Sequence, residues 1–83
     1  MELRLGVVDD FFSHVGVIAI KLEEEISLGD TIHVKGHTTD FTQTVESMQI
    51  EHVSVQKAKK GDNVGIKVKE RARKGDIVYK VLP

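Results

Sequence analysis

The stretch that decides the fold class is Val45–Lys69, which reads VESMQIEHVSVQKAKKGDNVGIKVK. Its last part alternates strictly between apolar residues and glycine or lysine, and the apolar phase consists of Val64, Ile66 and Val68. Alternation with a period of two residues is typical of a β-strand with one buried face. Gly61 and Asp62 come just before it and favour a tight turn, because glycine accepts positive φ and aspartate bonds to nearby backbone. We therefore predict a turn followed by a strand.

The same turn chemistry occurs twice more in the chain. One Gly-Asp pair precedes Thr31-Ile32 and another precedes Ile77-Val78. No Gly-Lys-Ser/Thr sequence follows any of these pairs, so they are not phosphate-binding loops. The positions that we predict to form structural turns are Gly29, Asp30, Gly61, Asp62, Gly75 and Asp76.

The rest of the chain adds strands and shows no sustained helical period. We expect strands at Leu3–Phe12, Val15–Leu22, Thr31–Gly36, Phe41–Ile50, Asn63–Glu70 and Ile77–Leu82. The apolar phase changes near Glu46-Ser47, which predicts a β-bulge or a strand end. Residues 51–60 form the longest irregular stretch, with anchors expected at Val53, Val55 and Ala58. Short strands separated by Gly-containing turns predict an all-β fold. Because closure removes exposed edges, we favour a small closed antiparallel β-barrel of six to seven strands with little or no helix.

Length and composition narrow the choice further. A chain of 83 residues predicts a single domain, 1–83, and a domain of this size buries about 60% of the surface of its unfolded chain. No apolar run approaches the roughly 18 residues of a membrane-spanning helix, and the N-terminus lacks the apolar core of a signal peptide. Without cysteine there is no disulfide and no thiolate metal site. We expect a cytoplasmic protein.

Charge is divided unevenly along the chain. Residues 1–56 carry three Lys or Arg and ten Asp or Glu, whereas residues 57–83 carry nine and three. This division favours either an anionic partner or two solvated faces that attract each other. For the first alternative, the candidate RNA-phosphate contacts are Lys57, Lys59, Lys60, Lys67, Lys69, Arg71, Arg73 and Lys74. Aromatic residues are scarce, which argues against readout of single-stranded RNA by base stacking.

Several short motifs occur in the order of a known family. They are VVDDFFS at 7–13, GVIA at 16–19, ISLGDTI at 26–32, VESM at 45–48, AKKGDNVGI at 58–66 and RKGDIV at 73–78. In this order they resemble the second domain of translational GTPases, the β-barrel that follows the nucleotide-binding domain in elongation factor Tu, elongation factor 1-alpha and initiation factor 2. The resemblance covers almost the whole chain and implies the same barrel. A phosphate loop and a nucleotide-binding domain are missing, so we expect no bound nucleotide and no GTPase activity.

The resemblance also implies a groove. In elongation factor Tu this barrel helps to hold the aminoacyl end of transfer RNA. Asn63 falls at the position of a family asparagine that lies near the aminoacyl group. Gln49 falls where the elongation factor has a glutamate beside the terminal adenine, and glutamine cannot supply that carboxylate. The groove positions implied by the resemblance are therefore Gln49 and Asn63.

No set of residues indicates catalysis. Asp9-Asp10 are neighbours in a predicted strand, so their side chains point to opposite faces. His33 and His37 would lie roughly 13 Å apart along a strand, too far for one zinc ion at Zn–N distances of about 2 Å. Ser13-His14 lack an orienting acid and an oxyanion hole. We expect no enzyme, no metal and no cofactor.

The sequence therefore predicts a non-catalytic, translation-factor-like binding module for RNA, the ribosome or another translation component. The alternative is a protein-binding adaptor or accessory subunit that acts with a separate enzyme. Salt-dependent retention on RNA favours the first function, and nuclease-insensitive co-purification with one protein favours the second.

Overall fold

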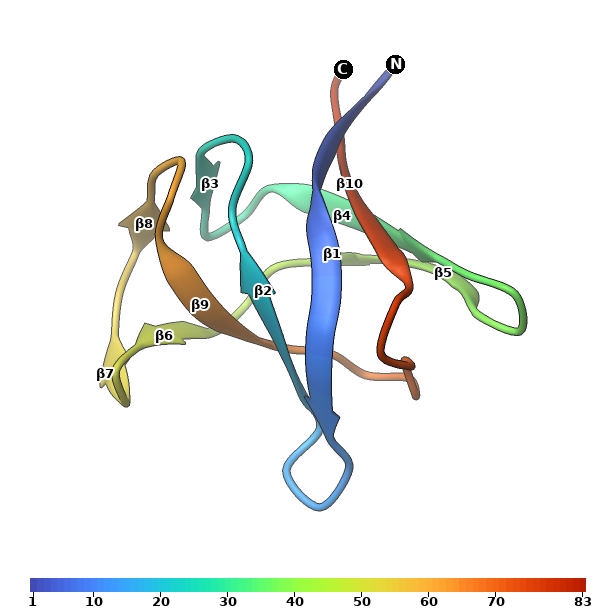
Figure 1. Ribbon diagram of the computed structural model, residues 1–83. Coiled ribbons are helices and arrows are strands. Elements are labelled where there is room, and N and C mark those ends of the chain that lie inside the picture. Colours follow the sequence, from blue (N-terminus) through green and yellow to red (C-terminus); the bar gives the residue numbers. More distant parts are fainter.

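The computed structural model describes residues 1–83 and contains strands, turns and loops but no helix (Figure 1). Eight strands form an antiparallel sheet in the order β5-β4-β10-β1-β2-β9-β6-β7, and β3 pairs with β8 in a second, two-stranded sheet. The strands are β1 Glu2–Phe12, β2 Val17–Lys21, β3 Ile26–Ser27, β4 Thr31–Lys35, β5 Asp40–Thr44, β6 Met48–Ile50, β7 Val53–Ser54, β8 Lys57–Ala58, β9 Asn63–Lys67 and β10 Ile77–Val81. The prediction of an antiparallel all-β fold is confirmed. Nothing in the structure has the length and apolarity of a helix that crosses a membrane.

The strand count and the edges of the sheet differ from the prediction. The structure has ten strands rather than six to seven, because β3, β7 and β8 have two residues each and are too short to show alternation. The strand expected at Phe41–Ile50 is divided into β5 and β6 near the change of phase. It divides because Val45 leaves the ladder, donating its N–H to Asp30 and accepting from Gly29. The sheet ends at β5 and β7, which do not pair with each other, so no ladder closes it into a barrel.

β1 connects the two halves of the sheet. Its first half pairs with β10 and its second half with β2, and its register shifts twice, between Arg4 and Gly6 and between Val8 and Asp10. Each shift inserts a residue and bends the strand, so Leu5 and Val8 both face the core although they are three residues apart. Gly6 is needed at the first shift, because a Cβ there would lie 2.7 Å from the carbonyl oxygen of Lys21.

One apolar core of 17 buried residues fills the space that the sheet encloses. Its central row is formed by Ile18, Ile66 and Met48, which pair across β2, β9 and β6. Val53 does not act as the anchor that the sequence predicts. It is 64% exposed, because β7 is an edge strand of two residues that lies outside the core.

The three Gly-Asp turns share one construction. Gly29, Gly61 and Gly75 take φ of 93°, 94° and 96°. In each turn the aspartate Oδ2 accepts the backbone N–H of the residue three positions earlier, at distances of 2.9, 3.0 and 2.8 Å. Positive φ at the third residue is the requirement of a type II turn, and the aspartate carboxylate satisfies a donor that the turn leaves free. These turns set the directions in which β4, β9 and β10 begin.

Candidate functional site

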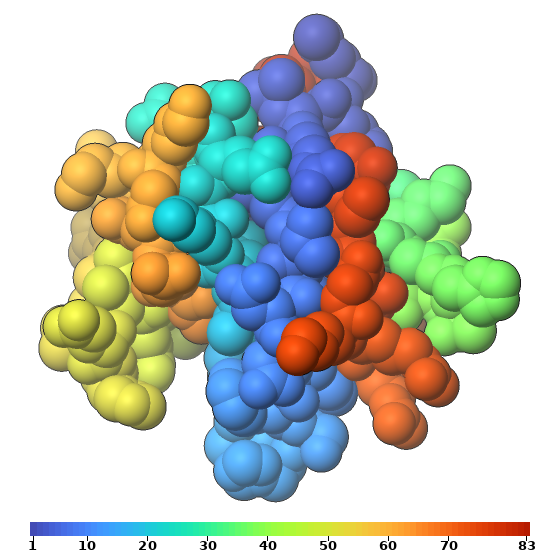
Figure 2. Space-filling model, in the orientation of Figure 1, coloured from blue at the N-terminus to red at the C-terminus, as the bar shows by residue number.

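A groove with a volume of about 710 Å³ lies on the outer face of β2 and β9. The β1–β2 hairpin forms one wall, and β6 with the turn to β7 forms the other. In Figure 2 the groove is the recess between the blue atoms of the hairpin and the yellow atoms around β6 and β7. Its volume falls in the range of about 300–1,000 Å³ that is usual for ligand sites.

The floor of the groove is a cross-strand row in which two of the three positions have almost no side chain. Ala19 on β2 pairs with Gly65 on β9, which in turn pairs with Gln49 on β6. Neighbouring outward rows lie about 7 Å away along the strands and carry larger side chains, including Val17 and Asn63. A Cβ at Gly65 would lie 3.1 Å from Cγ1 of Val17, so glycine keeps this part of the trough open.

The apolar run Val15–Leu22 is explained by this floor. Ile18 and Ile20 point inward and are buried in the core, whereas Val17 and Ala19 point outward and are only half-buried. A strand that is apolar in both phases suits burial on both faces or closure of a barrel. The outer face of this strand instead lines the groove.

The hairpin wall is apolar with one acidic side chain. Phe12 and Val15 are 42% and 47% exposed and both line the groove. Asp9, at the second register shift of β1, also lines it. Asp10 does not, and its Oδ1 accepts the N–H of Phe11 at 2.9 Å. The two neighbouring carboxylates therefore have different surroundings, as residues on opposite faces of a strand should.

The opposite wall ends in a strained turn. Glu51 and His52 take φ of 50° and 66°, and they connect Ile50 to its ladder partner Val53. Two consecutive residues with positive φ are the signature of a type I′ hairpin turn, which usually contains Asn-Gly. Here neither residue is glycine, and strain of this kind collects at functional sites. Without the usual Asn-Gly signal, this hairpin was not predictable from the sequence.

The charged side chains of the groove have no partners within the protein. The side chains of Asp9, Glu51 and Lys67 make no ion pair and no hydrogen bond. His14 and His52 complete the titratable groups of the lining. No group of three or more His, Asp or Glu side chains in the molecule is arranged to hold a metal ion. The groove therefore offers an apolar patch at Ala19 and Gly65 with isolated charges around it.

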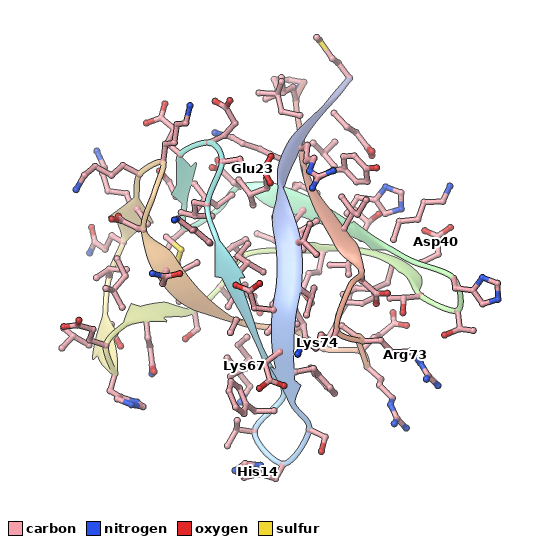
Figure 3. All side chains as sticks on the ribbon, in the orientation of Figure 1. His14, Glu23, Asp40, Lys67, Arg73 and Lys74 are labelled. Carbon is pink, nitrogen blue, oxygen red and sulfur yellow. The ribbon has the colours of Figure 1, made fainter.

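The structure divides the predicted RNA-binding residues between the two ends of β9. Lys57, Lys59 and Lys60 lie in β8 and in the turn before β9. Lys67 is the last residue of β9, and the expected strand phase stops there. The remaining predicted residues follow it, and they are Lys69, Arg71, Arg73 and Lys74. Figure 3 shows Lys67 and Lys74 near the β1–β2 hairpin and Arg73 beside the turn before β10. RNA binding by these residues stays a prediction.

Three further placements concern single residues of the predicted sites. Lys67 lines the groove, whereas Lys69 and Arg71 border a smaller recess of about 370 Å³ next to Phe11. Gln49 and Asn63, the positions implied by the family resemblance, both line the groove. The sequence did not indicate the residues of the hairpin and of the Glu51-His52 turn that complete it.

Comparison with known sequences relates the chain to parts of larger proteins. No protein-family model matches it. The chain is 42% identical over 79 residues to a protein of Methanocaldococcus jannaschii named an uncharacterized protease. It is 39% identical over 81 residues to a collagenase of Porphyromonas gingivalis. These matches cover 94% and 95% of the chain but only 19% and 20% of the relatives, so the chain spans about one fifth of their length.

Solved structures share the fold. Two crystal structures show the C-terminal domain of a Geobacillus thermoleovorans protein described as a U32 peptidase. They match with TM-scores of 0.85 and 0.86 at 20% and 21% sequence identity. The first match covers 92% of this chain and 96% of the solved domain, and the second covers 94% and 91%.

These relationships correct three predictions. The resemblance to the second domain of translational GTPases is wrong, and so is the function drawn from it, a translation-factor-like binding module or an adaptor for a separate enzyme. The prediction that the chain is no enzyme is contradicted by relatives named protease and collagenase. The motifs GDTI, GDNV and GDIV form type II turns with an aspartate cap. Such turns determine how strands begin and do not indicate what the protein binds, so they gave a wrong family resemblance. The chain has the fold of the C-terminal domain described for a U32 peptidase, and its matched relatives are a protease and collagenases.

Proposed function

We propose that this chain forms the C-terminal domain of a U32-type peptidase and that its groove binds polypeptide for that enzyme. The observation that carries the proposal is the 42% identity, over 94% of the chain, to part of a protein named a protease. The shared fold of the solved U32 domain supports the same assignment.

The shape of the groove supports polypeptide as its ligand. An extended chain with its side chains is about 10 Å thick, which is the distance between two sheets that pack face to face. It therefore needs a trough about 10 Å wide. The rows that flank Ala19 and Gly65 lie about 7 Å to either side, which leaves room for one such chain. Exposed Phe12 and Val15 provide apolar contact for its side chains. The relatives named collagenase make extended polypeptide the substrate class that we propose.

The position of the chain ends agrees with this role. Both termini lie side by side at one end of the molecule (Figure 1), where Leu82 donates its N–H to the carbonyl of Met1 at 2.8 Å. The β1–β2 hairpin, which forms a wall of the groove, lies at the other end. A peptidase joined to this domain through Met1 leaves the groove open.

We also propose that the sheet works as a closed barrel, which keeps the groove floor rigid. The support is the Gln43 side chain, whose Nε2 donates to the carbonyl of Lys67 at 2.9 Å and whose Oε1 accepts the N–H of Lys69 at 2.8 Å. The N–H of Lys67 also donates to the carbonyl of Ser47 at 3.1 Å. The Gln43 bonds join the edge strand β5 to the end of β9, and the Ser47 bond joins β9 to the segment before β6, where no ladder exists.

A domain exchange tests the assignment to a peptidase. In the Porphyromonas gingivalis collagenase, the matching segment is deleted or replaced by this chain, and cleavage of gelatin is measured. We expect the deletion to lower cleavage and the replacement to restore it. A folded replacement no more active than the deletion contradicts the proposal, as does a deletion that keeps full activity.

Two variants of the replacement locate the effect. Ala19→Phe fills the floor of the groove and should remove the gain. Thr42→Phe places the same ring on an exposed position of β5, outside the groove, and should keep it. Equal activity of the two variants would remove the groove from the proposal.

A further inference from the structure

The groove carries a pair of carboxylates on opposite walls. Asp9 lies on β1 and Glu51 lies in the turn that follows β6. Between β1 and β6 run β2 and β9, so the walls are three strand spacings apart, or about 14 Å. Neither carboxylate has a partner in the protein.

An extended peptide that crosses the groove matches this spacing. Residues i and i+4 of an extended chain lie about 13 Å apart on the same face, with residue i+2 between them. Basic side chains at i and i+4 then reach Asp9 and Glu51, and residue i+2 lies over Ala19 and Gly65. That part of the floor is apolar and is bordered by Val17, so an apolar side chain fits there.

We infer that the groove binds an extended peptide segment with basic residues four positions apart and an apolar residue midway between them. This inference rests on the proposed function, because it names the polypeptide sequence that the groove prefers. Charge complementarity carries it: the lining holds two carboxylates against the single ammonium of Lys67.

The Glu51-His52 turn favours such recognition. Its two positive-φ residues are held by the ladder pairs Gln49–Ser54 and Ile50–Val53. The Glu51 backbone is therefore fixed before a ligand arrives, and less conformational freedom is lost on binding. Asp9 is likewise fixed by the register shift of β1.

The test measures binding of unlabelled, capped peptides to the 83-residue chain by isothermal titration calorimetry at low salt. The first peptide is Gly-Lys-Ser-Leu-Ser-Lys-Gly, acetylated and amidated so that only its lysines are charged. The second has glutamine in place of both lysines, the third has glutamate there, and the fourth has the first composition with the lysines adjacent. We expect the first peptide to bind about ten-fold more tightly than the second, and more tightly than the third and fourth.

Protein variants assign the effect to the two carboxylates. Asp9→Asn and Glu51→Gln should each weaken binding of the first peptide about three-fold and leave the second unchanged. Glu24→Gln removes an exposed carboxylate outside the groove and should have no effect, and Lys67→Gln should tighten binding. Urea unfolding of each variant checks that the fold is kept.

Each contrary result has a separate meaning. Equal binding of the lysine and glutamine peptides, or no effect of Asp9→Asn and Glu51→Gln, overturns the inference and leaves the proposed peptidase domain to the exchange experiment. Preference for the glutamate peptide or for adjacent lysines also overturns it. If no peptide binds, both the inference and the groove part of the proposed function are wrong.

Discussion

The imidazole of His33 lies against the carboxylate of Asp40, with Nε2 2.6 Å from Oδ1. On its other side, Nδ1 lies 2.9 Å from Oε2 of Glu2. The hydrogen bond with Asp40 raises the pKa of His33 above 6.5, and Glu2 adds to the rise, while burial partly opposes it. The same bond lowers the pKa of Asp40 below 3.8. The cluster joins β4, β5 and the start of β1.

Stability should depend on pH through this cluster. A raised His33 pKa adds stability that is complete below pH 6.5 and is lost as the pH rises through the folded-state value. A lowered Asp40 pKa adds stability that is present above pH 3.8 and is lost as the pH falls. In thermal unfolding, the melting temperature of His33→Gln should therefore fall furthest below wild type between about pH 4 and 6.5. His37→Gln, at an exposed position in the next turn, is the control. A His33→Gln deficit that is the same at pH 5 and pH 8 contradicts this account.

Replacing Gln43 by alanine should weaken the connection between β5 and the end of β9. The change leaves the carbonyl of Lys67 and the N–H of Lys69 without their side-chain partner. We expect a loss of about 1–2 kcal/mol in the free energy of unfolding, measured with urea. Hydrogen exchange at the Lys69 amide should become faster. Gln56→Ala, at an exposed position whose side chain makes no hydrogen bond, should change neither quantity. An unaltered Lys69 amide in Gln43→Ala would show that the bridge does not hold β5 against the end of β9.

Replacing Glu51-His52 by Asn-Gly should stabilise the protein. Positive φ costs an ordinary residue about 1–2 kcal/mol, whereas asparagine and glycine tolerate it. After the extra flexibility of glycine in the unfolded chain is subtracted, we expect a net gain of about 1 kcal/mol in urea unfolding. The same variant should prefer the lysine peptide about three-fold less strongly than wild type, because Glu51 is gone while Asp9 remains. His37→Gly lacks the positive φ and should destabilise. A loss of stability in the Asn-Gly variant would mean that the turn is not strained.

Substitutions at Gly75 should report backbone conformation alone. Its φ is 96°, and a Cβ at this position would have no atom within 4 Å, so crowding plays no part. Gly75→Val should lose more than about 1 kcal/mol of unfolding free energy, and Gly75→Asn should lose less, because asparagine tolerates positive φ. Equal losses would point to some other cause. Gly36→Ala provides a contrast, since its Cβ would collide with the carboxylate of the buried Asp76.

The local part of the fold could be predicted from the sequence. Alternation in Asn63–Lys67 and the Gly-Asp pairs depend on neighbours in the chain, so they mark β9 and its turn without tertiary information. The bridge from Gln43 to Lys69 spans 26 residues and left no local pattern. The Glu51-His52 turn was missed because tertiary packing imposes a conformation that its residues do not favour.

The groove was harder to predict than the strands. It is assembled from the outward faces of β1, β2, β6 and β9, and an outward face carries no requirement for apolar residues. The apolar outer phase of Val17 and Ala19 was the available signal, but such a strand equally suits burial on both faces or closure of a barrel. The family resemblance did bring Gln49 and Asn63 to notice, but for a ligand that the relatives do not support.

The shortness of β7 has a consequence for concentrated solutions. Self-association into fibrils begins when the free edge of one sheet recruits a strand from another molecule. β7 offers only Val53 and Ser54 for such recruitment, and the preceding turn bends the chain away, although Val53 is an exposed apolar residue. The other edge, β5, carries exposed Asp40, Thr42 and Thr44. Because neither edge of the eight-stranded sheet is a long apolar strand, we expect the protein to resist fibril formation through edge pairing.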